Sequence, residues 1–465
     1  MNWKPHSRFP ARSNLLLVTL LCTLTALLAP LFLNAAERPN IVLLLSDDHS
    51  WTDYGFIGHD VVQTPNIDKL QARSATFRRG YLPTALCRPS LATLATGLYA
   101  HQHGITGNDP SRGVWKRDSK EYTKQREKII SNIDRIPTIG RMLSEVGYLS
   151  HQSGKWWEGS YERGGFTHGM TRGFPEKGGR HGDDGLKIGR AGMEPIFDFI
   201  DLAEKEKKPF YIWYAPFLPH TPHNPPERLL KKYRADGRPI TVAKYYAMID
   251  WLDETCGQLI DRIEEKGMLD NTLFVYVADN GWIQNPERNG YALRSKQSPN
   301  EGGVRSPILY SWPGVIKAGE RPELTSSIDI VPTMLAAAGV DVPGDLPGLN
   351  LLDPLKSGKA IERDHIFGEG FAHDIKDPDN PQATLLYRWI IQGHHKLLLT
   401  YDGEVAAYST THPRDEKRPQ LFDLSKDPAE NNNIAADNPE RVAELATKIG
   451  QWWPVTERKV LTVFE

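Results

Sequence analysis

Three short apolar runs, each followed within a few residues by polar ones, stand out along this chain. Residues 41–45 and 273–278 consist of hydrophobic side chains and lead into Asp-Asp and Asp-Asn pairs, and residues 210–214 form a third run. A short continuous run of this kind is typical of a strand buried on both faces of a parallel sheet. Helical patterns lie at residues 136–146, 245–266 and 330–338. This alternation predicts an α/β fold with a large mixed, mainly parallel sheet sandwiched by helices.

The pattern changes from about residue 365. Residues 389–391, 395–399 and 420–424 are favoured as strands of an antiparallel sheet, and residues 439–453 as an amphipathic closing helix. We therefore expect a catalytic α/β domain over residues 37–364 and a smaller α+β region over residues 365–465.

The first 36 residues are typical of an export signal. Lys4, Arg8 and Arg12 precede a nearly continuous apolar stretch at residues 15–33, and small residues follow up to Ala36. We expect cleavage near Ala36 and a secreted protein, periplasmic in a bacterium-like cell. The alternative is an uncleaved membrane anchor, because the apolar stretch approaches the length that spans a bilayer.

Composition excludes several classes of protein. The 465 residues carry 56 Lys plus Arg against 58 Asp plus Glu, so no basic surplus indicates nucleic acid. Three cysteines cannot build a disulfide framework, and Cys22 lies in the segment expected to be removed. Cys87 and Cys256 remain.

Two pairs of oxygen-bearing side chains follow the first and last of the three apolar runs. They are Asp47 with Asp48 and Asp279 with Asn280. Ligands bind at the carboxyl ends of parallel strands, where both pairs are expected. Three carboxylates and one amide oxygen suit a hard cation and not zinc. We expect Ca²⁺ here, with Mg²⁺ or Mn²⁺ as alternatives.

Residues 159–192 form a long segment rich in glycine and in basic side chains, with no period. Long ordered loops are often functional lids, and a solvated surface insertion is the equal alternative. Its basic character is typical of binding to an anionic polymer such as a sulfated polysaccharide.

Residues 86–97, Leu-Cys-Arg-Pro-Ser-Leu-Ala-Thr-Leu-Ala-Thr-Gly, resemble the nucleophile motif of the type I sulfatases, of the alkaline phosphatase superfamily. Cys87, Pro89 and Ser90 match Cys-x-Pro-Ser-Arg, and Thr96-Gly97 matches the end of the motif. Further resemblances follow in order along the chain: Asp47-Asp48 with Asp53, Gly154-Lys155-Trp156, Pro219-His220-Thr221-Pro222, Asp279-Asn280-Gly281, Lys296 with 301–305, and Asp427-Pro428 with Glu430 and Asn433.

The resemblance implies a role for each matching residue. Cys87 would be oxidised to formylglycine by a formylglycine-generating or anaerobic sulfatase-maturing enzyme, and would act as nucleophile and metal ligand. Lys155 and Lys296 would hold the sulfate oxygens. His220 would hold the sulfate or protonate the leaving group. His223, three residues on, is expected to be a histidine of the surface loop.

The chain departs from the family pattern at two positions. Leu91 stands where the family has the Arg after Pro-Ser, and Trp157 stands where it has the His after Gly-Lys-Trp. We expect the Trp157 ring to narrow the site or to face the leaving group. Residues near the motifs that could replace the missing groups are Arg88, His49, His101, His103 and His151.

These observations predict an exported sulfuric ester hydrolase acting on a sulfated small molecule or polysaccharide. Two alternatives stay open. One is a phosphate or phosphonate ester hydrolase of the same superfamily, since the same metal and lysine set could serve phosphoryl transfer. The other is a non-catalytic protein that binds an anionic glycan, although such a protein has no chemical need for Cys87.

Overall fold

The computed structural model describes residues 38–404 and 416–462. The expected export signal, residues 1–36 with Cys22, lies outside the described residues. In the part that is described, no helix combines the length and the apolar character needed to cross a membrane.

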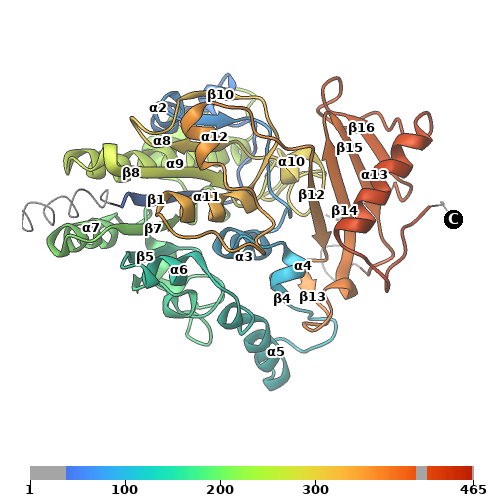
Figure 1. Cartoon of the computed structure of the whole chain (residues 1–465), viewed down its shortest axis with the longest axis horizontal. Coiled ribbons are helices and arrows are strands. Elements are labelled where there is room, and N and C mark those ends of the chain that lie inside the picture. The colour runs from blue at the N-terminus through green and yellow to red at the C-terminus, as the bar shows by residue number, and fades with distance from the viewer. Residues whose placement is uncertain (1–37, 405–415, 463–465) are drawn as a thin grey trace, which may run out of the picture. The chain divides into compact units, whose positions relative to one another are not determined.

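An eight-stranded sheet forms the centre of the chain (Figure 1). Its strands, in spatial order, are β10 (Gly319–Arg321), β2 (Ala75–Phe77), β9 (Ile308–Ser311), β8 (Thr272–Ala278), β1 (Asn40–Ser46), β7 (Phe210–Ala215), β5 (Leu149–Gly154) and β6 (His168–Gly169). Only β9 runs antiparallel to its neighbours β2 and β8. The predicted mixed, mainly parallel sheet is confirmed, and the three apolar runs are β1, β7 and β8.

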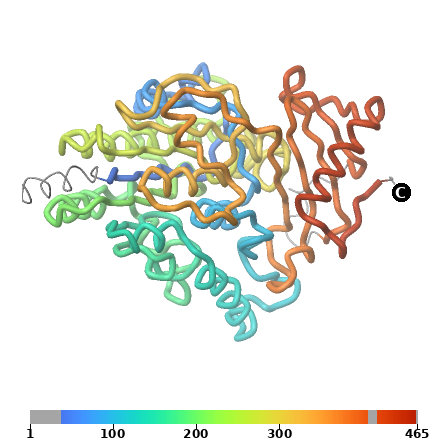
Figure 2. The backbone as a smooth tube through the Cα atoms, in the orientation of Figure 1, coloured from blue at the N-terminus to red at the C-terminus, as the bar shows by residue number. Residues whose placement is uncertain are grey.

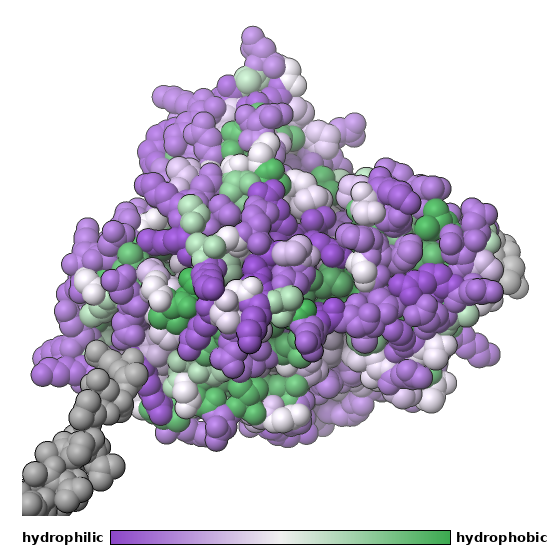
Figure 3. All heavy atoms as spheres, turned by 45° about the horizontal axis from the view of Figure 1, so that its top comes forward, coloured by the Kyte–Doolittle hydropathy of each residue, from purple (hydrophilic) through white to green (hydrophobic). Residues whose placement is uncertain are grey.

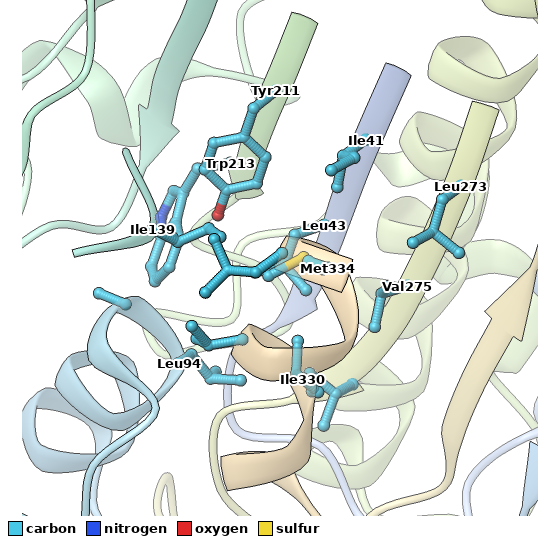
Figure 4. Close-up of a cluster of buried hydrophobic side chains, with 14 of the residues drawn as sticks. Ile41, Leu43, Leu94, Ile139, Tyr211, Trp213, Leu273, Val275, Ile330 and Met334 are labelled. Carbon is cyan, nitrogen blue, oxygen red and sulfur yellow. The ribbon is translucent and has the colours of Figure 1, made fainter. Parts of the chain in front are cut away.

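Successive side chains of the central strands point to opposite faces, and helices cover both. Leu43, Trp213 and Val275 pack against α3 (Cys87–Thr96), α6 (Ile139–Glu145) and α11 (Ile330–Ala337), as Figure 4 shows. Leu44 and Ile212 pack on the other side against α2 (Pro65–Ala72), α7 (Glu194–Glu206) and α9 (Ile240–Glu265). Because both faces are buried, these strands are apolar throughout their middle, at residues 41–45, 210–214 and 273–278.

The last part of the chain forms a second, antiparallel sheet, seen at one side of Figures 1 and 2. Its strands in order are β12 (His365–Phe371), β14 (Leu385–Gln392), β15 (His395–Thr400) and β16 (Gln420–Asp423). Leu445 and Ile449 of α13 (Pro439–Trp452) pack against it. The predicted antiparallel α+β region is confirmed.

Shorter elements connect these layers: α4 (Ala100–His103), α5 (Lys120–Ile130), α8 (Glu227–Tyr233), α10 (Glu301–Val304), α12 (Leu352–Ser357), and the strand pairs β3 (Gly80–Tyr81) with β11 (Thr325–Ser326) and β4 (Asp109–Pro110) with β13 (Asp374–Ile375). Figure 3 shows a mainly hydrophilic face on which hydrophobic residues are scattered.

Candidate active site

Four polar residues meet where β1 and β8 end. The two strands are parallel neighbours with Ser46 opposite Ala278, so the residues that follow them come together at one edge of the sheet. The Asp48 amide donates to Asp279 Oδ1 at 3.0 Å, and Asn280 Nδ2 donates to Asp48 Oδ1 at 2.7 Å. Asp48 has a φ of 65°, a left-handed conformation that ends the alternation of the strand. Asp47 and Asp48 can therefore serve one site.

The oxygens of this group fit a hard cation. Each residue has one buried oxygen without a hydrogen-bond partner among the residues that the structure describes: Asp47 Oδ2, Asp48 Oδ2, Asp279 Oδ2 and Asn280 Oδ1. Burying such atoms unpaired is costly, and repulsion within the group raises the cost. Burial, opposed by Lys155 and reinforced by the other carboxylates, holds the pKa of Asp47 well above its usual value. A divalent cation bound by these oxygens would offset both effects.

Cys87 lies beside this group at the first residue of α3. Leu86 before it is extended, and the helix begins at the cysteine. The Sγ atom is 3.9 Å from Asp48 Oδ1. Ligand atoms of Asp47, Asp48, Cys87 and His220 all lie within 4.8 Å of one another. Burial raises the pKa of the Cys87 thiol to about 12, although Lys155 and Lys296 oppose this.

Two buried ammonium groups compensate the carboxylates. Lys155, directly after β5, places Nζ 2.6 Å from Asp47 Oδ1 and 3.7 Å from Asp279 Oδ2. Lys296 Nζ is 2.5 Å from Asp48 Oδ1. Burial lowers the pKa of each lysine, but the surrounding anionic groups outweigh it and hold the pKa above its usual value. Both side chains therefore stay positively charged.

His220 enters the site from the segment after β7. This segment is tied to β1, because the Asp47 amide donates to the Leu218 carbonyl at 2.9 Å. His220 Nδ1 lies 2.5 Å from the Thr221 carbonyl oxygen, which fixes the proton on Nδ1. Nε2 is then free of a proton and lies 3.4 Å from Asp48 Oδ2. Burial, together with Lys155 and Lys296, holds the pKa of His220 well below its usual value.

A cavity of about 530 Å³ opens over this group. Asp48, Cys87, His220 and Lys296 line it together with polar and aromatic residues from several loops: Asn108, Trp157, Arg180, His181, Thr221, Pro222, His223, Trp282, Asn289, Gly290, Tyr291, Gln297 and His373. Of the residues predicted from the sequence, Asp48, Cys87, His220 and Lys296 face the cavity. The other four lie directly behind these and do not line it: Asp47, Lys155, Asp279 and Asn280.

The two departures have different structural outcomes. Leu91 is buried in the hydrophobic core with Leu94 and therefore supplies no charge next to Cys87. Trp157 lines the cavity, as expected, with 3% of its surface exposed. The Arg180 guanidinium stacks on its ring at 4.7 Å.

None of the five residues suggested as replacements lines the cavity. Arg88 binds Glu158 through two hydrogen bonds of 2.7 and 2.6 Å, in full burial. His101 pairs with Glu369 at 2.7 Å. The remaining three are packed in the interior: His49 against Tyr54, His103 beside Thr93, and His151 against Phe199.

Several residues of the cavity lining were not found by sequence reasoning, among them Arg180, His181 and His223. Arg180 and His181 come from the glycine-rich segment 159–192, where only their basic side chains hinted at a role. The expectation of a surface position for His223 was wrong: it is 8% exposed, packs between Tyr245 and Trp282, and lines the cavity. The prolines on either side of it gave no indication of this.

Comparisons with known proteins agree with the geometry. The family described as Sulfatase matches residues 39–340, and the one described as N-sulphoglucosamine sulphohydrolase, C-terminal, matches residues 291–452. Arylsulfatase A of Bos taurus is 30% identical over 92% of this chain and 89% of the bovine protein. N-acetylgalactosamine-6-sulfatase of Homo sapiens is 28% identical over 85% of this chain and 81% of the human protein. The crystal structure of Ps i-CgsB in complex with k-i-k-neocarrahexaose has a TM-score of 0.69 and 25% identity, covering 90% of this chain and 93% of that one.

Proposed function

Because this chain belongs to the sulfatase family and is a sulfuric ester hydrolase, we propose that it removes sulfate from a sulfated saccharide with a formylglycine made from Cys87 and a divalent cation. One observation carries the proposal. Two buried ammonium groups, Cys87 and four buried oxygens that have no hydrogen-bond partner among the described residues lie together at the floor of one cavity and directly behind it.

The cation would be held by Asp47, Asp48, Asp279 and Asn280, with position 87 as a further ligand. We propose Ca²⁺, because every donor from the strand ends is a hard oxygen; Mg²⁺ and Mn²⁺ share this preference. When bound, the cation supplies positive charge next to the sulfate group. The three carboxylates then gain a counter-charge that the two lysines supply only in part.

Formylglycine at position 87 supplies a hydrated aldehyde with one hydroxyl for attack on sulfur and a second for release of sulfate. Its formation requires a formylglycine-generating or anaerobic sulfatase-maturing enzyme. Cys87, Pro89 and Ser90 support recognition by such an enzyme.

Lys155 and Lys296 bind the non-bridging oxygens of the ester, where negative charge is concentrated. Both stay protonated because their own carboxylate partners stabilise the charged form. Either role of His220 at Nε2, holding a sulfate oxygen or protonating the leaving oxygen, requires that Nε2 first takes up a proton. Its hydrogen bond to the Thr221 carbonyl supports this assignment by fixing the orientation of the ring.

The substrate proposed is a sulfated sugar, free or in a polysaccharide. Aromatic residues on the cavity wall, Trp157, Trp282 and Tyr291, suit the faces of sugar rings. The relatives named above include an N-acetylgalactosamine-6-sulfatase and a protein in complex with k-i-k-neocarrahexaose, which supports the same class.

We also propose the organisation expected from the sequence: an export signal cleaved near Ala36, a catalytic domain over residues 37–364 and a C-terminal region over residues 365–465. The protein would then act outside the cytoplasm.

A panel of aryl sulfate, aryl phosphate and phosphonate esters tests the proposed function, with the enzyme purified from its native host and assayed with added Ca²⁺ or Mn²⁺. Sulfate ester cleavage at least about a hundredfold faster than that of the other esters is expected. Preference for phosphate or phosphonate esters would move the protein to the related hydrolases. Binding of sulfated sugars with no turnover of any ester would leave a glycan-binding protein.

A further inference from the structure

One wall of the cavity is built by a segment that carries no recognised motif. Residues 159–192 run alongside the Lys155–Trp157 stretch, and the Trp156 amide donates to the His181 carbonyl at 3.1 Å. Thr171 Oγ1 donates to the Gly182 carbonyl at 3.1 Å. These two bonds hold the consecutive carbonyl groups of His181 and Gly182 and so fix the backbone at His181. The segment therefore presents Arg180 and His181 to the cavity as an ordered wall.

The imidazole of His181 lies among the aromatic rings of the site. Its centroid is 5.2 Å from that of Trp157 and 5.3 Å from that of Phe217. Phe217 in turn stacks on His220 at 4.3 Å, and Lys155 Nζ lies 5.6 Å from the Phe217 centroid. The Phe217 ring thus lies between His181 and two other residues of the site, Lys155 and His220.

Arg180 and His181 each keep a polar atom that makes no hydrogen bond to the described residues. His181 Nδ1 is buried and has no hydrogen-bond partner among the described residues. Arg180 uses Nε and Nη2 to bind Asp109, and no bond of its Nη1 to any described residue occurs. Burial, with Lys155 and Arg180 nearby, lowers the pKa of His181 to about 3, so the ring is neutral and offers one N–H donor.

We propose that His181 is a catalytic residue that donates a hydrogen bond to the sulfate group of the substrate, in place of the polar side chain that position 157 has lost. The inference rests on the proposed function. The oxygens of a sulfate ester only accept hydrogen bonds, and the neutral imidazole of His181, which lines the cavity, has one N–H that either ring nitrogen can carry; the proposed donor is the nitrogen that faces the cavity. Arg180, stacked on Trp157, holds that wall in place and adds positive charge beside it.

The test compares His181→Gln with His151→Gln. His151 is a matched control because it is also buried, has an unpaired Nδ1 and has a pKa lowered to about 3, yet packs against Phe199 away from the cavity. With 4-methylumbelliferyl sulfate as substrate, His181→Gln is expected to lower kcat/KM about a hundredfold, as for loss of one transition-state donor. His151→Gln is expected to stay within about threefold of the wild type.

A second measurement is independent of turnover. In the Cys87→Ala background, calorimetric titration with inorganic sulfate reports binding alone, and adding His181→Gln is expected to weaken affinity about tenfold. Thermal unfolding of each variant checks that it is folded. Unchanged kcat/KM and unchanged sulfate affinity in folded His181→Gln would overturn the inference. A wild type that cleaves no sulfate ester, but whose sulfate affinity depends on His181, would contradict the proposed function and support His181 as an anion ligand.

Discussion

Asn280 donates a hydrogen bond of 2.7 Å to Asp48 although the two residues are 232 positions apart in the sequence. The contact exists because β1 and β8 lie side by side and end at the same level of the sheet. With Nδ2 engaged in this bond, Asn280 Oδ1 is left without a hydrogen-bond partner among the described residues, as are Asp47 Oδ2, Asp48 Oδ2 and Asp279 Oδ2. The proposed cation site is therefore a direct result of strand order.

Removing one proposed ligand should abolish the effect of the cation on stability and activity. Wild type with Ca²⁺ at about a hundred times its Kd is expected to gain about 2.7 kcal/mol of stability over the chelated protein. Asp279→Ala is expected to lose this gain together with its cation-dependent activity. Asp345→Ala, a change at an exposed carboxylate, is the control. Thermal unfolding with EDTA and with added Ca²⁺ measures the stability gain of each variant. If Asp279→Ala were stabilised by Ca²⁺ as much as the wild type, Asp279 would be excluded as a ligand.

A buried ion group joins the antiparallel sheet to the region that carries Lys296. Lys396 Nζ on β15 lies 3.0 Å from Glu301 and 2.9 Å from Glu430, and all three side chains are buried. Lys396→Met would leave Glu430 without its cation and Glu301 with Arg305 alone, 3.4 Å away, which is expected to cost about 3–5 kcal/mol. Urea unfolding measures the loss. Lys426→Met, at an exposed pair with Asp423, should change stability little, and an equal loss in both variants would argue against a special role of burial.

Acid should weaken the wall that carries Arg180. Burial raises the pKa of Asp109, but its hydrogen bonds and charge pairing with Arg180 and Arg126 outweigh this and hold its pKa well below the ordinary 3.8. A depressed folded-state pKa stabilises the protein above about pH 4 and loses that effect as pH falls.

Asp109→Asn is therefore expected to be less stable than wild type at pH 7, with a difference that narrows at acid pH. Asp184→Asn is the control, because that carboxylate is about half exposed and pairs, among the described residues, only with the exposed side chains of Lys187 and Arg172. Unfolding midpoints measured from pH 7 downward give the comparison, and a difference that is constant with pH would show that the Asp109 charge does not contribute.

Histidine at position 157 should compensate for loss of His181. In the His181→Gln background, Trp157→His is expected to restore kcat about tenfold or more, because an imidazole returns to the cavity wall. Trp157→His should cost less stability than the roughly 3–5 kcal/mol of a Trp-to-Ala change, because the imidazole fills part of the space left by the indole. Trp156→His is the contrast: Trp156 packs against Phe166 and Trp213 and should lose stability without a gain in kcat. Loss of stability with no change in kcat for Trp157→His would make Trp157 a core residue only.

The sequence predicted the central strands, and the meeting of the two polar pairs at their ends, for a physical reason. Strands buried on both faces must be apolar at every position, so residues 41–45 and 273–278 could be recognised and their polar ends placed at one sheet edge. The same reasoning could not find His181, because its segment has no period and its position depends on two hydrogen bonds, from the Trp156 amide to the His181 carbonyl and from the Thr171 hydroxyl to the Gly182 carbonyl.

Arg88 shows the opposite difficulty. Its place next to Cys87 suggested a catalytic charge, but its side chain is used by Glu158, a residue that also lies next to a motif. Which charged partner a side chain meets is decided by tertiary packing, and adjacency in sequence carries no information about it.

The chemical state of residue 87 tests the central claim most directly. Peptide mass spectrometry on active protein purified from its native host should find formylglycine at position 87, in spite of Leu91 in the recognition sequence. The same peptide from a host that lacks a maturing enzyme should retain cysteine, and that protein should be inactive. An unmodified thiol at full occupancy in active protein would contradict the formylglycine mechanism.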